Sequence, residues 1–400
     1  MAEIQLYHHE AGRRGKPDRL DADIAHLIGA VLLKQDPQAR FDLRVHGGVE
    51  NKVPEEPSSG DLVVRIGGEI SSHLLTNASR SRVAEVTKQH YDSIQRSTSS
   101  LSVDTSAFKP QEVTLATNGK AGDSGVGTAV AFIDTPNYLP WERFLAVDIK
   151  DLIDDIYQDS GRVPSNLATI SGVDHIEGIR ADGKVGVDVA YCDGYKVLTD
   201  IVVAVNHEEN TNIELELTNV IKAYLGIIAN RHPSAILTSP NITINGYGPW
   251  TNEAGWTVDA GDREAKPQND YFGAWGNVAD APFGEDPSKP EGPASMLARY
   301  IAVNVVGIKL ASFAKVILSY KIGEDQPRLN IYTAGTSTVP QKELELAMKS
   351  ALGNLSIKAT AERFSLRSPE LYRQVALESD MFHNPNLPWN QVHPGLYAGR

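Results

Sequence analysis

Residues 283–302 read Phe283-Gly-Glu-Asp-Pro-Ser-Lys-Pro-Glu-Gly-Pro-Ala-Ser-Met-Leu-Ala-Arg-Tyr-Ile-Ala302. The first half is polar, contains Gly and Pro, and has neither the helical period of 3.6 nor the strand period of 2, so it predicts a loop. The second half begins a strongly apolar segment, which predicts a core helix over 294–314. The loop reaches back to Asp259, and a long polar loop that leads into a core helix is a common place for a functional site.

The loop contains Lys266 and Lys289 among several carboxylates. Lysines that neutralise phosphate oxygens and carboxylates that hold a hard cation would suit a polyphosphate bound with a divalent metal. The same composition also describes a solvated surface loop. Taken by itself, the segment favours that second interpretation.

The apolar helix after the loop is one of three similar helices in the chain. Comparable helices are predicted over 19–33 and 144–157, so the first helices of three units begin near residues 18, 143 and 293. Each is accompanied by paired strands and a second helix. The predicted strands are 4–7, 41–45, 62–66, 112–115, 186–191, 200–205, 242–244, 315–321 and 328–333, and the other helices are 77–93, 212–229, 341–352 and 370–379.

This order predicts an α+β protein built from one unit used three times. The predicted units are an N-terminal repeat at 1–115, a central repeat at 116–240 and a C-terminal repeat at 241–400, with strands exchanged between repeats. A sheet covered by helices on one face must bury its other face. Packing of the three units around a pseudo-threefold axis, or pairing of subunits, would achieve this.

Composition restricts the possible functions. The 400 residues carry 38 basic and 51 acidic side chains, a net charge of −13, which argues against nucleic-acid binding and against anionic membrane surfaces. The single cysteine, Cys192, excludes an internal disulfide. Without a membrane-spanning apolar run or a signal-peptide pattern, the sequence predicts a cytoplasmic protein.

Several short motifs stand out along the chain. They are Gly15-Lys-Pro-Asp-Arg19, Lys34-Gln-Asp-Pro-Gln-Ala-Arg40, Gly67-Gly-Glu-Ile70, Ala121-Gly-Asp-Ser-Gly125, Asp182-Gly-Lys184, Asp259-Ala-Gly261, Phe283-Gly-Glu-Asp-Pro-Ser-Lys289, Ala298-Arg-Tyr-Ile-Ala302 and Ser319-Tyr-Lys-Ile-Gly323. Their order and spacing, from residue 5 to about residue 390, resemble those of the methionine adenosyltransferase family, the enzymes that make S-adenosylmethionine from ATP and methionine.

The resemblance implies a three-part βαββαβ architecture and a transfer of the adenosyl group. In the family, the methionine sulfur attacks C5′ of ATP and expels tripolyphosphate, which is then hydrolysed to pyrophosphate and phosphate. Two Mg²⁺ ions and several cationic side chains stabilise this leaving group, usually with K⁺ nearby. The family's active site lies between subunits, which implies a homodimer or a dimer of dimers.

The resemblance also assigns roles to residues of this chain. It places Asp18 and Glu291 on the metal, and Lys16, Lys184, Lys266 and Lys289 on the polyphosphate, close to the chemistry. Glu69, Asp123 and Asp259 correspond to carboxylates on the methionine side. Asp182 and Arg19 correspond to residues on the nucleotide side.

Four positions depart from the family pattern. Lys16 replaces a histidine, and Arg44 replaces the glutamate of the K⁺ site, a charge reversal that argues against K⁺ binding. Ala265 replaces an arginine that clamps phosphate, and Glu285 replaces a phosphate-binding lysine. The segment between Leu115 and Gly122 also lacks most of the family's mobile lid.

The resemblance therefore implies an adenosyltransferase that acts on ATP and on methionine or a related thioether amino acid. The departures keep a second interpretation open, in which the chain is a catalytically weakened nucleotide-binding or regulatory homologue of the synthetase.

Overall fold

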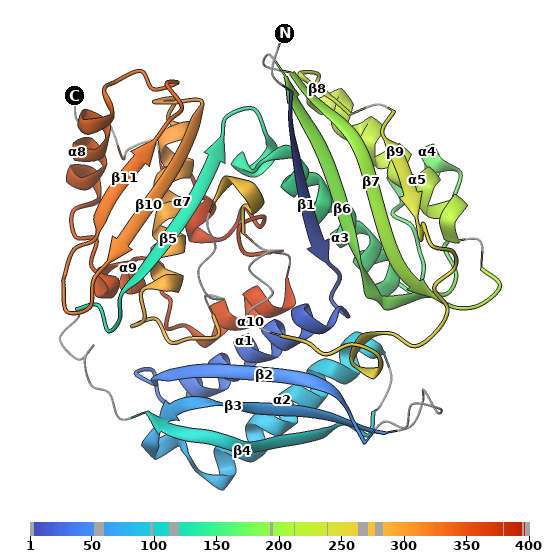
Figure 1. Ribbon diagram of the computed structural model, residues 1–400, viewed down its shortest axis with the longest axis horizontal. Helices are drawn as coiled ribbons and strands as arrows, with labels where there is room; N and C mark the ends of the chain where they lie inside the picture. The colour runs from blue at the N-terminus through green and yellow to red at the C-terminus, as the bar shows by residue number, and fades with distance from the viewer. Residues whose placement is uncertain are drawn as a thin grey trace.

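The computed structural model describes residues 4–51, 60–96, 99–111, 120–192, 195–211, 213–237, 239–262, 271–276, 283–378, 380–393 and 396. Three β-sheets lie on three sides of the molecule, and helices α1 and α10 lie between them (Figure 1). Each sheet is accompanied by helices, so the α+β class predicted from the sequence is confirmed.

The N-terminal sheet has the order β2-β3-β4, with β2 antiparallel and β4 parallel to β3. Helices α1 and α2 pack together beside it. The elements are α1 (Pro17–Gln35), β2 (Phe41–Glu50), β3 (Asp61–Ser71), α2 (Asn77–Gln95) and β4 (Ser102–Gln111).

The central sheet has the order β1-β6-β7, and both β8 and β9 pair with β7. Its long hairpin alternates buried valines with more exposed residues, as a half-covered sheet requires. The elements are β1 (Gln5–Gly12), α3 (Trp141–Gln158), α4 (Ser165–Ser171), β6 (Ile179–Cys192), β7 (Tyr195–His207), α5 (Ile213–Arg231), β8 (Ala235–Ile236) and β9 (Asn241–Ile244).

The C-terminal sheet has the order β11-β10-β5. Helix α7 packs tightly on it: a Cβ atom at Gly127 of β5 would lie 2.2 Å from the Ala294 carbonyl carbon, so only glycine permits this approach. The elements are β5 (Gly125–Phe132), α7 (Glu291–Gly307), β10 (Phe313–Tyr320), β11 (Arg328–Tyr332), α8 (Gln341–Leu352), α9 (Ile357–Arg363) and α10 (Pro369–Leu377).

Two strands belong to sheets whose other strands lie far away in the sequence. β1 pairs with β6 of the central sheet, and β5 pairs with β10 of the C-terminal sheet. The domain boundaries at 115 and 240 and the pseudo-threefold relation between the units stay predictions.

Three local features differ from the predicted elements. Residues 102–111 form β4 and residues 125–132 form β5, although no strand is predicted over either range. The helix predicted to end at 314 ends at Gly307, because apolar residues after it form β10 instead. The N-cap of α2 is Thr76, whose side chain accepts the Ser79 N–H. The strand predicted at 112–115 lies outside the described residues.

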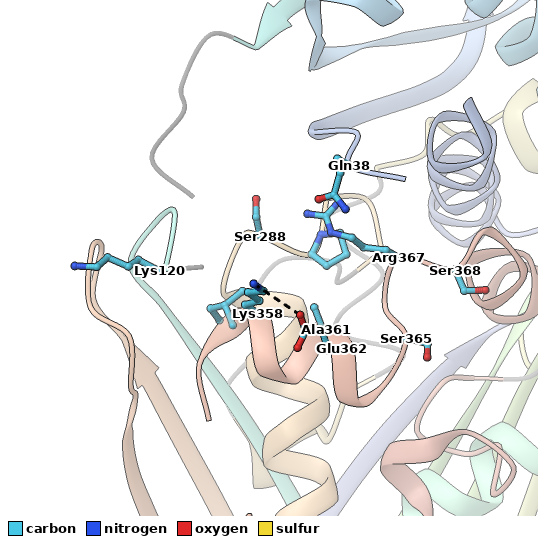
Figure 2. Close-up of a pocket in the computed structure, with 11 residues that line it drawn as sticks. Gln38, Lys120, Ser288, Lys358, Ala361, Glu362, Ser365, Arg367 and Ser368 are labelled. Atoms are coloured by element: carbon cyan, nitrogen blue, oxygen red, sulfur yellow. Dashed lines mark ion pairs between the residues drawn. The ribbon is translucent and has the colours of Figure 1, made fainter. Parts of the chain in front are cut away.

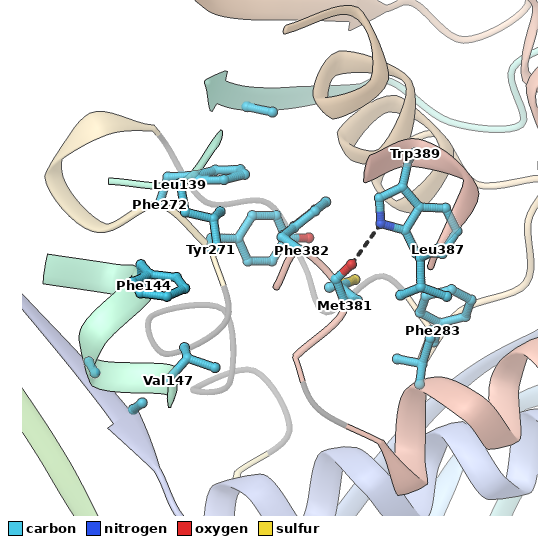
Figure 3. Packing of buried hydrophobic residues seen from close by; sticks show 14 of the residues in the cluster. Leu139, Phe144, Val147, Tyr271, Phe272, Phe283, Met381, Phe382, Leu387 and Trp389 are labelled. Carbon is cyan, nitrogen blue, oxygen red and sulfur yellow. Dashed lines mark hydrogen bonds between the residues drawn. The ribbon is translucent and has the colours of Figure 1, made fainter. Parts of the chain in front are cut away.

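One buried apolar cluster extends through all three sheets and their helices, and the C-terminal segment contributes Phe382, Leu387 and Trp389 to it. Figure 3 shows Tyr271 and Phe272 near Phe382, and Leu387 and Trp389 close to Phe283. The Trp389 indole N–H donates to the Met381 carbonyl oxygen at 2.8 Å, which satisfies its polar atom inside an apolar cluster. This packing holds Tyr271, Phe272 and Phe283, which belong to the loop that precedes α7.

Candidate active site

The junction between β1 and α1 is held against β6. The Gly15 N–H donates to the Ala181 carbonyl oxygen at 3.2 Å. A Cβ atom at residue 15 would lie 2.6 Å from Ala181, so only glycine at this position lets the two main chains come this close. Pro17 then starts α1, where a missing N–H costs nothing. The junction therefore presents Lys16 and Asp18 at the start of a 19-residue helix.

Asp18 has two polar contacts in this place. One carboxylate oxygen is paired with the Lys16 ammonium group, and the other accepts the Asp262 N–H at 3.1 Å. A carboxylate has about four lone-pair positions, so both oxygens keep capacity for a further cation. The proposed metal ligand and the proposed phosphate-binding lysine are therefore neighbours.

One turn further into α1, Asp21 is completely buried. Its carboxylate accepts the Gly47 N–H at 3.3 Å, and a Cβ atom at Gly261 would lie 2.2 Å from it. Burial, followed by the negative charges of Asp18 and Asp262, raises the pKa of Asp21 well above its usual range. No motif in the sequence indicates a role for this residue.

Asp182 fastens the segment around Gly255 to the central sheet. Its two carboxylate oxygens accept the N–H groups of Gly183 and Gly255, each at 2.7 Å. Burial raises the pKa of Asp182, while these two bonds act in the opposite direction. Asp182 also lines a polar cavity of about 530 Å³ between α2, β6 and residues 252–255.

Lys184 lies on the exposed face of the central sheet. Its ammonium group is 2.9 Å from the Glu10 carboxylate of β1, and its side chain is about half exposed. Asp259 is exposed and lines a smaller cavity of about 220 Å³ next to Trp256. Asp259 also accepts the Ala260 N–H at 3.0 Å.

Arg19 differs from the other expected site residues because it points into the protein. Its guanidinium group lies 3.1 Å from Asp23 and the residue is buried, as is its partner. The helix period explains this, since residues 19 and 23 occupy the same buried face of α1. The expected contact of Arg19 with a nucleotide has no direct support in this arrangement.

A second group of charges surrounds Lys289. Its ammonium group is 2.6 Å from Asp42 and 3.1 Å from Glu285. Burial would lower the pKa of Lys289, but the carboxylates of Glu285 and Asp42 outweigh this effect and raise it. The backbone of 284–286 holds this group in place, because it pairs with β2 at Phe41 and Leu43.

The remaining expected residues lie on elements near this second group. Glu69 is exposed on β3 and faces Asp42 in the antiparallel register. Glu291 is the first residue of α7, and its carboxylate lies beside Gly125 of β5. Asp123 lies two residues before Gly125, is exposed, and accepts the Ser124 N–H at 2.7 Å.

The two groups lie apart within one chain. Gly47, in the second half of β2, contacts Asp21 of the first group, whereas Asp42, near the start of the same strand, belongs to the second. The two positions are five residue steps apart along the strand, which is about 17 Å. The structure thus brings Lys16, Asp18 and Asp182 to one region and Lys289 and Glu69 to another.

Among the departures, Arg44 lies 2.5 Å from Asp42, so its positive charge adds to the second group. Lys266 and Ala265 lie outside the described residues. Sequence reasoning missed Glu10 and Asp42, the carboxylates that pair with Lys184 and Lys289. Strand alternation places each on an exposed or half-exposed face, but it does not indicate their partners.

A cavity of about 700 Å³ adjoins the second group on the side of α9 (Figure 2). Ser288 lies on one wall, and Lys358 and Glu362 of α9 lie across from it with their charged atoms 4.0 Å apart. Arg367 lines the same cavity, but its guanidinium group is 3.6 Å from the buried Asp286 carboxylate. It therefore has a structural partner.

In the described part of the chain, no three His, Cys, Asp or Glu side chains are grouped so that they could hold a metal ion. None of the described helices is long and apolar enough to cross a membrane.

The fold and the charged groups define an α+β protein with lysine–carboxylate pairs at sheet edges and at the start of a helix. Residues 253–391 match the family model described as S-adenosylmethionine synthetase, C-terminal domain. An S-adenosylmethionine synthase of Mycolicibacterium gilvum is 25% identical over 432 residues, which cover 98% of each chain. Those of Maridesulfovibrio salexigens and Aquifex aeolicus are each 27% identical over 398 residues, 96% of this chain and 94% and 95% of theirs. The chain therefore resembles a divergent S-adenosylmethionine synthetase, by the family model over 253–391 and by similarity to named synthases over nearly its whole length.

Proposed function

We propose that the protein transfers the adenosyl group of ATP to the sulfur of methionine or of a related thioether amino acid. The products are S-adenosylmethionine and tripolyphosphate, which is hydrolysed to pyrophosphate and phosphate. Relatives named S-adenosylmethionine synthase match nearly the whole chain. The observation that carries the proposal is the neighbouring placement of Lys16 and Asp18 at the start of α1, with Lys184 on the adjacent strand pair.

The reaction requires little covalent chemistry from the protein. A sulfur lone pair forms the bond to C5′, and the C5′–O bond breaks with its electron pair going to the tripolyphosphate. Lys16, Lys184 and Lys289 now contact carboxylates, and each would exchange that partner for phosphate oxygens. Lys266, which lies outside the described residues, completes the proposed set.

Magnesium is part of the proposal. Asp18, with lone pairs left on both oxygens, and Glu291, at the start of α7, are the residues that would hold it. When bound, Mg²⁺ would neutralise charge on the leaving tripolyphosphate. Glu69 and Asp123, both exposed, are proposed to receive the amino group of the methionine substrate. Asp259, which lies beside Trp256, is proposed as a further carboxylate on the methionine side.

A homodimer is also part of the proposal, and the separation of the two charged groups supports it. One phosphate chain cannot contact both when they lie about 17 Å apart on β2. The exposed face of the central sheet carries Lys184 together with Leu6 and Val202, whose exposed fractions are 63% and 49%. We propose that a second copy covers this face and brings its own Lys289 and the charges around it to Lys184 of the first copy.

The decisive experiment incubates the purified protein with ATP, methionine and Mg²⁺ and measures products by mass spectrometry. S-adenosylmethionine should form, and Lys184→Met should abolish most of it. Lys196→Met is a matched control, because Lys196 also pairs with a carboxylate, Asp134, at the far end of the same hairpin. Absence of product at every methionine concentration would refute the proposal, and products across a thioether panel would identify the acceptor.

One observation favours a second candidate function. Each described lysine of the proposed site is already neutralised by a carboxylate, and Lys289 is held by two. This arrangement suits a weakened nucleotide-binding or regulatory homologue. Calorimetry that shows ATP binding without turnover, or tight association with an active synthetase, would support this alternative.

A further inference from the structure

Arg13 is a buried arginine between the end of β1 and the start of α1, and it has no exposed surface. Its Nε donates to Oδ1 of Asp154 on α3 at 2.8 Å, and only 4% of the Asp154 side chain is exposed. The other carboxylate oxygen of Asp154 accepts the main-chain N–H of Arg14 at 3.3 Å. A buried ion pair and a second hydrogen bond therefore hold the junction between β1 and α1 against α3.

The same guanidinium group also reaches β6. Its Nη1 donates to the carbonyl oxygen of Arg180 at 2.6 Å and to that of Asp182 at 3.2 Å. The strand pairing is interrupted here, since among the described strands residues 180–182 are in register with neither β1 nor β7. Carbonyl groups outside the sheet ladder need another donor, and the side chain of Arg13 supplies it. Arginine suits this place because its planar group can donate to a carboxylate and to carbonyls at the same time.

The main chain of Arg13 is joined to both parts of the first charged group. The Arg13 carbonyl oxygen accepts the Lys16 N–H at 3.0 Å, which closes the turn before Asp18. The Arg13 N–H donates to the Gly183 carbonyl oxygen at 2.9 Å, directly after Asp182. Burial raises the pKa of Asp182, and the positive charges of Arg13 and Lys16 are among the effects that lower it. Arg13 thus lies between the segment that carries Lys16 and the segment that carries Asp182.

These two segments, the start of α1 and residues 182–184, carry proposed contacts to ATP. Resting on the proposed function, we propose that the Arg13–Asp154 pair positions the start of α1 against residues 182–184, at the spacing that one bound ATP requires. Because Arg13 is fully buried, it acts through main-chain contacts and does not touch the ligand. Groups that are placed before the ligand arrives bind it more tightly, because less order has to be imposed on binding.

Two variants of the pair separate positioning from stability. Arg13→Lys keeps a positive charge for Asp154 but lacks the planar group that also reaches the two carbonyls. The double variant Arg13→Met/Asp154→Leu removes both buried charges together, so neither charge is left without its partner and the fold can be retained. Tyr224→Phe is the matched control, because it removes a buried hydroxyl that donates to Asp148, six residues before Asp154 on the same helix.

Isothermal titration of each full-length variant with ATP and Mg²⁺, without methionine, tests the inference directly. We expect Arg13→Lys and the double variant to bind ATP about tenfold more weakly than wild type, as loss of hydrogen bonds from a charged group predicts. Tyr224→Phe should bind ATP within about twofold of wild type, even where its melting temperature falls.

Steady-state kinetics give a second measurement that a purely structural role would not change in the same way. A destabilised variant has fewer folded molecules, which lowers the apparent kcat and leaves KM as it is. Lost positioning of binding groups instead raises KM for ATP, and we expect a rise of about tenfold in Arg13→Lys.

The outcomes separate this inference from the proposed function. Wild-type ATP affinity in the folded double variant overturns the positioning role alone, and where that variant does not fold, wild-type affinity in Arg13→Lys does so. An equal loss of affinity in Tyr224→Phe also overturns it, because the effect would then reflect stability. Weaker ATP binding in Arg13→Lys supports the inference even where the wild type makes no S-adenosylmethionine, a result that would refute the proposed function. A wild-type chain that binds no ATP refutes both.

Discussion

The Lys289 ammonium group lies 2.6 Å from the Asp42 carboxylate, although the two residues are 247 positions apart in the chain. Glu285 approaches the same ammonium group at 3.1 Å. The pairing of residues 284–286 with the start of β2 brings the three together. Lys289 therefore has to give up two carboxylates before it can contact a phosphate.

Removal of one of these carboxylates should strengthen anion binding. Glu285→Gln leaves Lys289 with Asp42 alone, and we expect affinity for inorganic tripolyphosphate to rise about three- to tenfold, in line with an ion pair worth about 1 kcal/mol. Calorimetry measures this directly. Glu324→Gln is the matched control, because Glu324 pairs with the exposed Lys321 at 3.4 Å. Unchanged affinity in Glu285→Gln would show that Lys289 does not contact the polyphosphate.

Asp21 should make stability depend on pH. Its folded pKa is raised, mainly by burial, above the unfolded value of about 3.9, so between these values the folded state binds more protons. Stability therefore falls as pH rises from about 4 to the raised pKa and then levels off. The free energy of unfolding of Asp21→Asn should lack this fall.

Urea denaturation of both proteins between pH 4 and pH 8 measures the difference. Asp325→Asn changes an exposed carboxylate and serves as the control. Parallel pH profiles for Asp21→Asn and wild type would contradict the assignment of this dependence to Asp21.

Two inactive variants should restore activity when mixed, if the site combines two chains. In a heterodimer of Lys184→Met and Lys289→Met, one of the two sites contains only wild-type residues. Random exchange makes half of the dimers mixed, so about 25% of wild-type activity should return. The measurement is the rate of S-adenosylmethionine formation after joint refolding, with each variant alone as the control. A mixture as inactive as its components would show that both lysines act in one chain.

Potassium should have little effect on the reaction. Arg44, which pairs with Asp42 at 2.5 Å, places a positive charge where the family has the glutamate of its K⁺ site. Replacement of KCl by choline chloride at constant ionic strength should change kcat by less than about twofold, since no bound K⁺ would be lost. Strong activation by K⁺ would mean that other groups provide the site.

The sequence was sufficient for most regular elements and for the family. Hydrophobic periodicity located α1, α3, α5 and α8 to within a few residues, because one buried face repeats every 3.6 residues. It failed at β4 and β5, because β4 contains Asp and Pro and β5 contains two glycines, residues that are depleted in strands. These segments become strands through pairing with β3 and β10. The collinear motifs identified the family because their order is preserved even where single residues have changed.

The charges of the candidate site show what only the tertiary structure decided. The sequence determined that Lys184, Lys289 and Asp18 are present at the spacing of the family. It did not determine that Lys184 meets Glu10, that Lys289 meets Asp42, or that Arg19 turns inward to Asp23. Lys184–Glu10 and Lys289–Asp42 depend on how distant strands and loops pair, and local periodicity carries no information about that pairing.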